Sequence, residues 1–265
     1  MTSWSLCTII EVSIYNSKWR QKIIRALIGS GAAFTDILIN ILISIPAVLI
    51  AISVHEAAHG YASYKLGDPT AKLMGRVTVN PLAHFDLFGA ICMLLFGFGW
   101  AKPVPFDLRY LKHPKRDTAI IAAAGPISNF LTGFVVCGIW VGIAYAALYT
   151  NPEWLSQGSI VSILLDMLKI IVSLNFSLMI FNLLPIPPLD GSKVLFSLLP
   201  VRAHRFILTY ERYGMAILML LLLTSDYLPW FLNVEYYLSW LVSKVFGFAF
   251  GVWDWLIGFV INLFV

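Results

Sequence analysis

The sequence predicts an all-α polytopic membrane protein with about five to six transmembrane helices and one re-entrant or β-hairpin segment near residues 70–105. Hydrophobic residues make up 59% of the 265 residues and charged residues only 12%, whereas soluble domains hold roughly 45–50% apolar and about 25% charged residues. Several apolar runs also approach the length of about 20 residues that crosses a bilayer. Because so few charged groups remain to cover a water-facing surface, this composition excludes a soluble enzyme and a nucleic-acid-binding module.

Five apolar segments are each long enough to cross a bilayer with some tilt. In chain order, the predicted transmembrane helices are 34–61, 118–149, 159–185, 213–230 and 236–262. The last two carry Trp and Tyr at their ends, as is typical of a membrane interface. Small residues open the second segment and allow close approach to another helix. Residues 1–30 are mixed in character, and we expect them to form an amphipathic segment that lies on the membrane.

Residues 62–117 differ from the apolar runs around them. The stretch KLGDPTAKLMGRVTVNPLAH is polar and rich in turn residues, and the apolar stretch FDLFGAICMLLFGFGW after it is interrupted by glycines. Irregular backbone at membrane depth needs protein or water around it, so we expect a re-entrant or interfacial hairpin and not a further span. Within it, KLMGRVTVN (72–80) alternates apolar and polar residues as a strand does.

Basic residues are distributed unevenly among the predicted loops. Eight lie in residues 62–117 and four in 190–212, while 150–158 and 225–235 hold none. The positive-inside rule therefore places the two basic loops on the cytoplasmic side. The four basic residues of the N-terminal segment conflict with this orientation, and an N-terminal helix lying in the interface is one way to resolve the conflict.

The sequence SVHEAAHG stands near the cytoplasmic end of the first predicted span. His55 and His59 are four positions apart, which places both imidazoles on one face of a helix where they can bind one ion. Glu56 follows His55, and its carboxylate can reach a water molecule bound to that ion. Ionisable groups inside a membrane helix are costly and usually functional. The alternative is a pair of histidines hydrogen-bonded within a helix bundle.

A catalytic zinc ion usually takes three protein ligands and keeps one position for water. The third predicted span ends in NLLPIPPLDG (182–191), where Asp190 follows a proline run that stops the helix and Gly191 lets the chain turn. A carboxylate at this end of the span is expected at the depth of His55 and His59, which makes Asp190 a candidate third ligand. The alternative is an aspartate that caps the segment 190–199.

Three motifs together resemble the site-2 protease family of intramembrane zinc metalloproteases: HEAAHG on the first span, AGPISN at the start of the next, and NLLPIPPLDG at the end of the third. GRVTVNPLAHFDLFGA and FGFGWAKPVPF are similar to the compact bacterial members, which lack PDZ-like and cystathionine-synthase-like (CBS) domains. The resemblance covers about residues 45–200. It implies one catalytic zinc ion on His55, His59 and Asp190, with Glu56 as the catalytic base. It also implies a substrate-binding role for Asn182 and Pro185; a helix-end hydrogen bond is the alternative for Asn182.

On this resemblance we expect an endopeptidase that cuts within or near transmembrane segments, in regulated intramembrane proteolysis or in the clearance of signal-peptide remnants. Its expected partners are transmembrane or signal-peptide substrates and the lipid bilayer, with no nucleic acid, and the oligomeric state is left open. We expect a multi-pass protein of a prokaryotic plasma (inner) membrane, with the active site toward the cytoplasm. The expected parts are an N-terminal interfacial segment, a protease core and C-terminal transmembrane helices: 1–33, 34–200 and 201–265.

The remaining polar segments and residues allow several interpretations. KLMGRVTVN can present a strand edge to an extended substrate, with a simple structural hairpin as the alternative. Asn129 can bond across helices, and a loop-stabilising role is expected for His84 and Asp86 over a second metal site or a gate. The competing functions are a membrane metal transporter, which should need several ligand sets along its path, and a proteolytically inactive membrane-protein binder, which need not keep Glu56.

Overall fold

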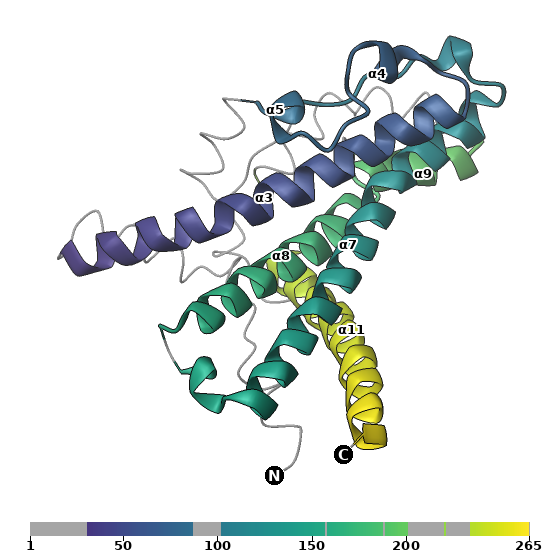
Figure 1. Ribbon diagram of the computed structural model, residues 1–265. Helices are drawn as coiled ribbons and strands as arrows, with labels where there is room; N and C mark the ends of the chain where they lie inside the picture. The colour runs from purple at the N-terminus through teal and green to yellow at the C-terminus, as the bar shows by residue number, and fades with distance from the viewer. Residues whose placement is uncertain are drawn as a thin grey trace. The chain divides into compact units, whose positions relative to one another are not determined.

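The computed structural model describes residues 31–86, 102–156, 158–187, 189–200, 220 and 234–264, and it is dominated by long helices (Figure 1). Within these residues no strand is formed. Four helices are long and apolar enough to cross a membrane, over Leu42–Lys65, Pro114–Thr150, Ile160–Asn182 and Tyr236–Leu263. They belong to α3 (Gly31–Lys65), α7 (Pro114–Thr150), α8 (Ile160–Asn182) and α11 (Val234–Phe264). The predicted class, an all-α polytopic membrane protein, is confirmed.

Four of the five predicted spans correspond to these helices. Helix α7 begins at Pro114, earlier than the predicted start at residue 118, because proline suits the first turn of a helix. The carboxylate of Asp117 also accepts the backbone N–H of His113 at 2.9 Å, which stabilises this helix start. The predicted span 213–230 (apart from Leu220) and the N-terminal segment 1–30 lie outside the described residues, so both stay predictions. The division into 1–33, 34–200 and 201–265 also stays a prediction. So does the re-entrant or β-hairpin segment near 70–105 as far as it depends on residues 87–101, which lie outside the described residues.

The strand predicted at residues 72–80 is not formed, which corrects the sequence interpretation. This stretch instead begins in the short helix α4 (Thr70–Leu73) and continues through a turn and bends. The carboxylate of Asp68 accepts the backbone N–H and the hydroxyl of Thr70 and so favours a helical turn there. Gly75 then adopts a positive φ of 68°, a conformation that interrupts an extended strand and suits glycine.

The described chain forms two compact units. The first comprises residues up to Val48, Leu131–Phe176 and Ser239–Val265. Within it, aromatic side chains fill the spaces left by glycines of α7: Phe176 lies against Gly133 and Trp253 against Gly138. Two polar contacts add to this packing, because the Trp253 indole donates to the Phe134 carbonyl at 2.9 Å and the Tyr145 hydroxyl donates to Asp254 at 2.8 Å.

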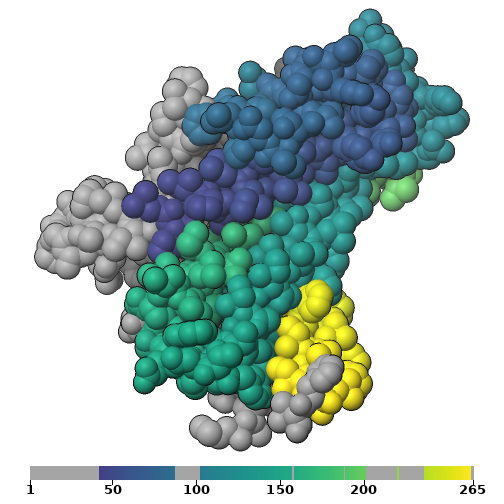
Figure 2. Space-filling model, viewed as in Figure 1, coloured from purple at the N-terminus to yellow at the C-terminus, as the bar shows by residue number. Residues whose placement is uncertain are grey.

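The second unit comprises Leu49–Phe130 and Ser177–Leu238 and holds every candidate site residue. It includes the end of α3, the start of α7 and the short helices α4, α5 (Pro81–His84), η1 (Leu108–Tyr110) and α9 (Asp190–Leu198). The 66–86 segment packs beside the C-terminal part of α3 (Figures 1 and 2). Gly60 permits this approach, because a Cβ there would lie 3.3 Å from a Val77 methyl and 3.5 Å from the Ala71 Cβ.

Asp68 joins the end of α3 to a later segment of the same unit. Its buried carboxylate accepts hydrogen bonds from the Ser63 hydroxyl at 2.9 Å and from the backbone N–H of Asp107 at 2.7 Å, besides those from Thr70. Burial by itself would raise the pKa of the Asp68 carboxyl, but these hydrogen bonds lower it below its usual range. The charged carboxylate therefore holds the segment that precedes α7 against α3.

Candidate metal centre and catalytic site

Three side chains predicted from the sequence as metal ligands meet at one point of the second unit. The Nε2 atoms of His55 and His59 lie 3.0 Å apart. Each also lies 3.1 Å from Oδ2 of Asp190. His55 and Asp190 are buried, each with 7% of its surface exposed. The three residues form the one group of potential ligands found among the described residues, so the aspartate that is distant in sequence joins the two histidines.

The local fold of each ligand follows from the sequence. His55 and His59 lie on successive turns of α3, so their rings project from the same helix face. Asp190 lies in the first turn of α9, after the proline-containing loop that separates α9 from α8. The absence of a side chain at Gly191 lets the start of α9 pack against the backbone of Leu183, because a Cβ at residue 191 would lie 2.2 Å from the Leu183 carbonyl oxygen. Its φ is not positive, so the expected role of Gly191 in turning the chain is replaced by close packing.

The other ring nitrogen of each histidine has its own partner. Nδ1 of His55 lies 2.5 Å from Oδ1 of Asn129, and Nδ1 of His59 lies 2.7 Å from the Ile121 carbonyl oxygen. Both partners are acceptors, so we infer that both Nδ1 atoms carry the proton. The Nδ2 group of Asn129 donates to the Ala51 carbonyl at 3.1 Å, which fixes the orientation of its amide. Both Nε2 lone pairs therefore face Asp190.

This donor set fits a zinc ion. Two neutral imidazoles and one carboxylate are a known ligand set of catalytic zinc, and two ligand atoms of a tetrahedral zinc ion lie about 3.3 Å apart. The observed separations of 3.0–3.1 Å are close to that value. Without a cation, two unprotonated nitrogens and a carboxylate oxygen at this distance would repel one another. The second carboxylate oxygen of Asp190 faces the Lys193 ammonium at 3.5 Å, which leaves Oδ2 for the histidines.

Glu56 is held by a different partner. Its Oε2 accepts the backbone N–H of Val104 at 3.1 Å. Glu56 is adjacent to His55 on α3 but is not a member of the three-residue ligand group. Glu56 therefore stays the candidate base that the sequence predicts.

Gly125 provides the space that the imidazoles occupy. A Cβ at this position of α7 would lie 2.5 Å from Nε2 of His59 and 2.6 Å from Cε1 of His55. Such distances are too short for any stable contact, so only glycine permits α7 to pass this close to α3. Small residues at this end of α7 are visible in the sequence, but the sequence does not indicate that Gly125 lies against the imidazoles. Val104 was missed as well, because the sequence does not show that its backbone N–H reaches Glu56.

The other polar residues singled out in the sequence have the following surroundings in the structure. The Asn182 amide donates to the Leu178 carbonyl at 3.0 Å, which is the helix-end bond expected as the alternative. Pro185 is exposed in the loop after α8. His84 is buried, and its Nε2 donates to the Thr78 carbonyl at 2.8 Å, as a loop-stabilising residue would. Asp86 lies at the edge of the described residues.

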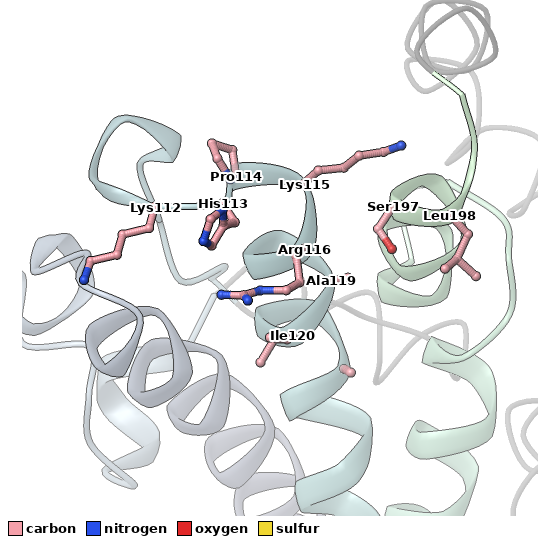
Figure 3. A pocket seen from close by; sticks show the side chains of 10 residues that line it. Lys112, His113, Pro114, Lys115, Arg116, Ala119, Ile120, Ser197 and Leu198 are labelled. Carbon is pink, nitrogen blue, oxygen red and sulfur yellow. The ribbon is translucent and has the colours of Figure 1, made fainter.

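A separate pocket of about 760 Å³ lies beside the start of α7 and the end of α9 (Figure 3). Its walls include four side chains that carry or can carry positive charge: Lys112, His113, Lys115 and Arg116. Ser197 and Leu198 of α9 line the same pocket. It contains none of the candidate metal ligands, so this pocket marks a basic surface of the unit and not the site of the chemistry.

Replacing Asn129 by alanine should weaken zinc binding about 10- to 100-fold, as the loss of a partner that orients a metal ligand usually does. The buried Nδ1–H of His55 would lose its acceptor, and the ring would no longer be held toward Asp190. Zinc affinity measured by competition with a chelator checks this expectation. Asn129→Asp keeps the acceptor and should retain most of the affinity; equal losses in both variants would contradict the orienting role.

Comparisons with known proteins agree on one family. The sequence model of peptidase family M50 matches residues 43–225 of this chain. A Bacillus subtilis (strain 168) protein named "Putative zinc metalloprotease YwhC" is 37% identical over 185 residues, which cover 69% of this chain and 82% of the relative. A Mycolicibacterium smegmatis protein named "Putative zinc metalloprotease Rip2" is 25% identical over 197 residues, which cover 71% of this chain and 70% of the relative. No solved structure matches the chain.

Proposed function

Because the chain belongs to peptidase family M50 and is a membrane zinc metalloprotease, we propose that it hydrolyses peptide bonds within or near the transmembrane segments of other membrane proteins. The observation that supports this most is the place of the ligand group. His55 and His59 lie on a helix that is apolar and long enough to span a membrane, next to the carboxylate of Asp190. A site on such a helix is suited to substrates that are themselves in the membrane.

In this proposal each site residue has one task. His55, His59 and Asp190 hold the zinc ion, and Glu56 is the general base. When bound, zinc supplies Lewis-acid activation of a water molecule and of the scissile carbonyl group. The Glu56 carboxylate takes the proton from the attacking water and returns it to the leaving amine. Asn129 and the Ile121 carbonyl keep the two imidazoles in the tautomer that binds metal.

Peptide bonds inside a helix are hydrogen-bonded and shielded, so a transmembrane substrate must unwind locally before it is cut. The loop after α8 is a candidate for contact with the unwound segment, because Pro185 is exposed there and Asp190 follows it at the site. We retain Asn182 and Pro185 as candidate substrate-binding residues on this ground. Signal-peptide remnants and single-span proteins are the substrates we propose.

We place the active site toward the cytoplasm of a prokaryotic inner membrane. The eight basic residues of the loop 62–117 belong to the same unit as the ligand group. Four residues with positive or titratable side chains from this loop line the pocket at the start of α7. Since basic loops stay on the cytoplasmic side of a bacterial inner membrane, this unit and its site are expected there.

The test is cleavage of a panel of single-span model proteins by the purified full chain in detergent, with the cut positions identified by mass spectrometry. We expect cuts within or next to the transmembrane segment. Removal of zinc with a chelator should abolish cleavage, and added zinc should restore it. The same peptides without their apolar segments serve as controls. Cleavage of these controls at an equal rate would contradict an intramembrane specificity, and zinc-independent cleavage would contradict the proposed site.

A further inference from the structure

We propose that the segment Lys102–Asp107, here named the strap, positions the carboxylate of Glu56 through the backbone N–H of Val104. This inference rests on the proposed function, in which Glu56 is the general base. The strap has the sequence KPVPFD and lies in the same unit as the metal ligands. Val104 is therefore a positioning residue that acts through Glu56, by its backbone and not by its side chain.

The sequence of the strap singles out one amide. Pro103 and Pro105 have no N–H, so Val104 carries the one backbone donor within residues 103–105. The proline after Val104 also favours extended backbone at Val104, and residues 102–107 have no helical or turn structure. Neither neighbouring residue can compete for the Glu56 carboxylate, and the donor that remains lies 3.1 Å from Oε2 of Glu56.

Both ends of the strap are fixed to the same unit. The Lys102 N–H donates to the His84 carbonyl at 2.9 Å. The Asp107 N–H donates to the buried Asp68 carboxylate at 2.7 Å. Between these two bonds, a methyl group of Val104 lies 3.4 Å from the place of a Cβ at Gly60, one turn beyond Glu56 on α3. The Val104 amide is thus held by bonds on either side of it.

Glu56 needs such a partner because glutamate has several rotatable bonds and loses conformational entropy when its carboxylate is fixed. A base that is misplaced by about 1 Å can lose about 100-fold in rate. The amide binds one oxygen, Oε2, and thereby leaves Oε1 to exchange a proton. The backbone N–H of Val104 meets that need as an uncharged donor.

The first test replaces the Val104 amide by an ester through incorporation of the corresponding hydroxy acid, which removes the N–H and keeps the side chain. We expect kcat to fall about 10- to 100-fold, with KM, zinc content and thermal unfolding unchanged. Val104→Ala keeps the amide, removes most of the side chain and should retain most of the activity. An ester variant with wild-type kcat overturns the proposal. A fall in the kcat of Val104→Ala as large as that of the ester variant also overturns it.

The second test does not depend on activity. In valine-labelled protein, the amide proton of Val104 is identified by the signal missing from Val104→Ala. We expect this proton to resonate downfield and to move upfield in Glu56→Ala, because the hydrogen bond to the carboxylate is lost. No movement overturns the contact. If the signal moves but Glu56→Gln still shows zinc-dependent cleavage, the contact exists and Glu56 is not the base. This result would overturn the catalytic purpose of the contact, and it distinguishes failure of the proposed base from failure of the contact itself.

Discussion

Glu56→Gln should lower kcat about 100- to 10,000-fold, the usual contribution of a general base, while zinc content stays at the wild-type level. Glutamine keeps the length of the side chain and an oxygen that can accept the Val104 N–H, but it cannot take a proton from water. Because Glu56 is not a member of the ligand group formed by His55, His59 and Asp190, the metal should remain bound. Turnover of a cleaved model substrate and elemental analysis of the purified protein provide the two measurements.

The matched control is Asp190→Asn, which alters a candidate ligand and leaves the base intact. It should lose both zinc and activity, because a neutral amide replaces the one negative charge in the ligand group. The two variants therefore fail in different ways if the assigned roles are correct. Loss of zinc in Glu56→Gln, or full activity in that variant, would contradict the role of Glu56 as base.

Gly125→Ala should abolish most zinc binding, although the substitution adds a single methyl group at a position that carries no chemistry. The new Cβ would lie 2.5 Å from Nε2 of His59 and 2.6 Å from Cε1 of His55. The rings cannot move away without losing the bonds to Asn129 and to the Ile121 carbonyl. We expect zinc affinity to fall at least about 10- to 100-fold, as when a partner that orients a ligand is removed. Competition with a chelator measures it.

Gly142→Ala in the same helix is the control for a general effect of alanine on α7. Among the residues that the structure describes, a Cβ at residue 142 would meet only a methyl group of Ile257, at 3.9 Å, which is ordinary contact. Alanine is also the better helix former by about 1 kcal/mol, so this variant should keep its zinc, activity and stability. Unchanged zinc affinity in Gly125→Ala would show that α7 and α3 are not packed as closely as described.

Local patterns account for what the sequence predicted well. The four spans that the structure describes follow from runs of apolar residues, and a spacing of four places His55 and His59 on one face of α3. Asp190 was identified by the proline run before it and by the family resemblance. Each apolar run and each motif lies within a short stretch of neighbouring residues. A single sequence therefore contains them, whatever the rest of the chain does.

The prediction was wrong where a short pattern competed with contacts made by residues outside that pattern. Residues 72–80 alternate as a strand does, but Asp68 starts a helical turn at Thr70 and no neighbouring strand is present among the described residues to supply hydrogen bonds. Gly191 resembles a turn residue in the sequence, whereas the carbonyl of Leu183 is the reason that no Cβ fits. In both cases the deciding atoms belong to residues that lie outside the pattern itself, a few positions before it.

The sequence by itself determined the membrane class, the helices long and apolar enough to span, and the candidate residues for binding a metal and moving a proton, because apolar length and side-chain chemistry are properties of short stretches. Only the tertiary structure decided that Asn129 orients His55, that Gly125 makes room for both imidazoles, and that the Val104 amide holds Glu56. These three contacts join residues more than forty positions apart in the chain. Distances and directions between such residues are set by packing, which sequence spacing does not encode.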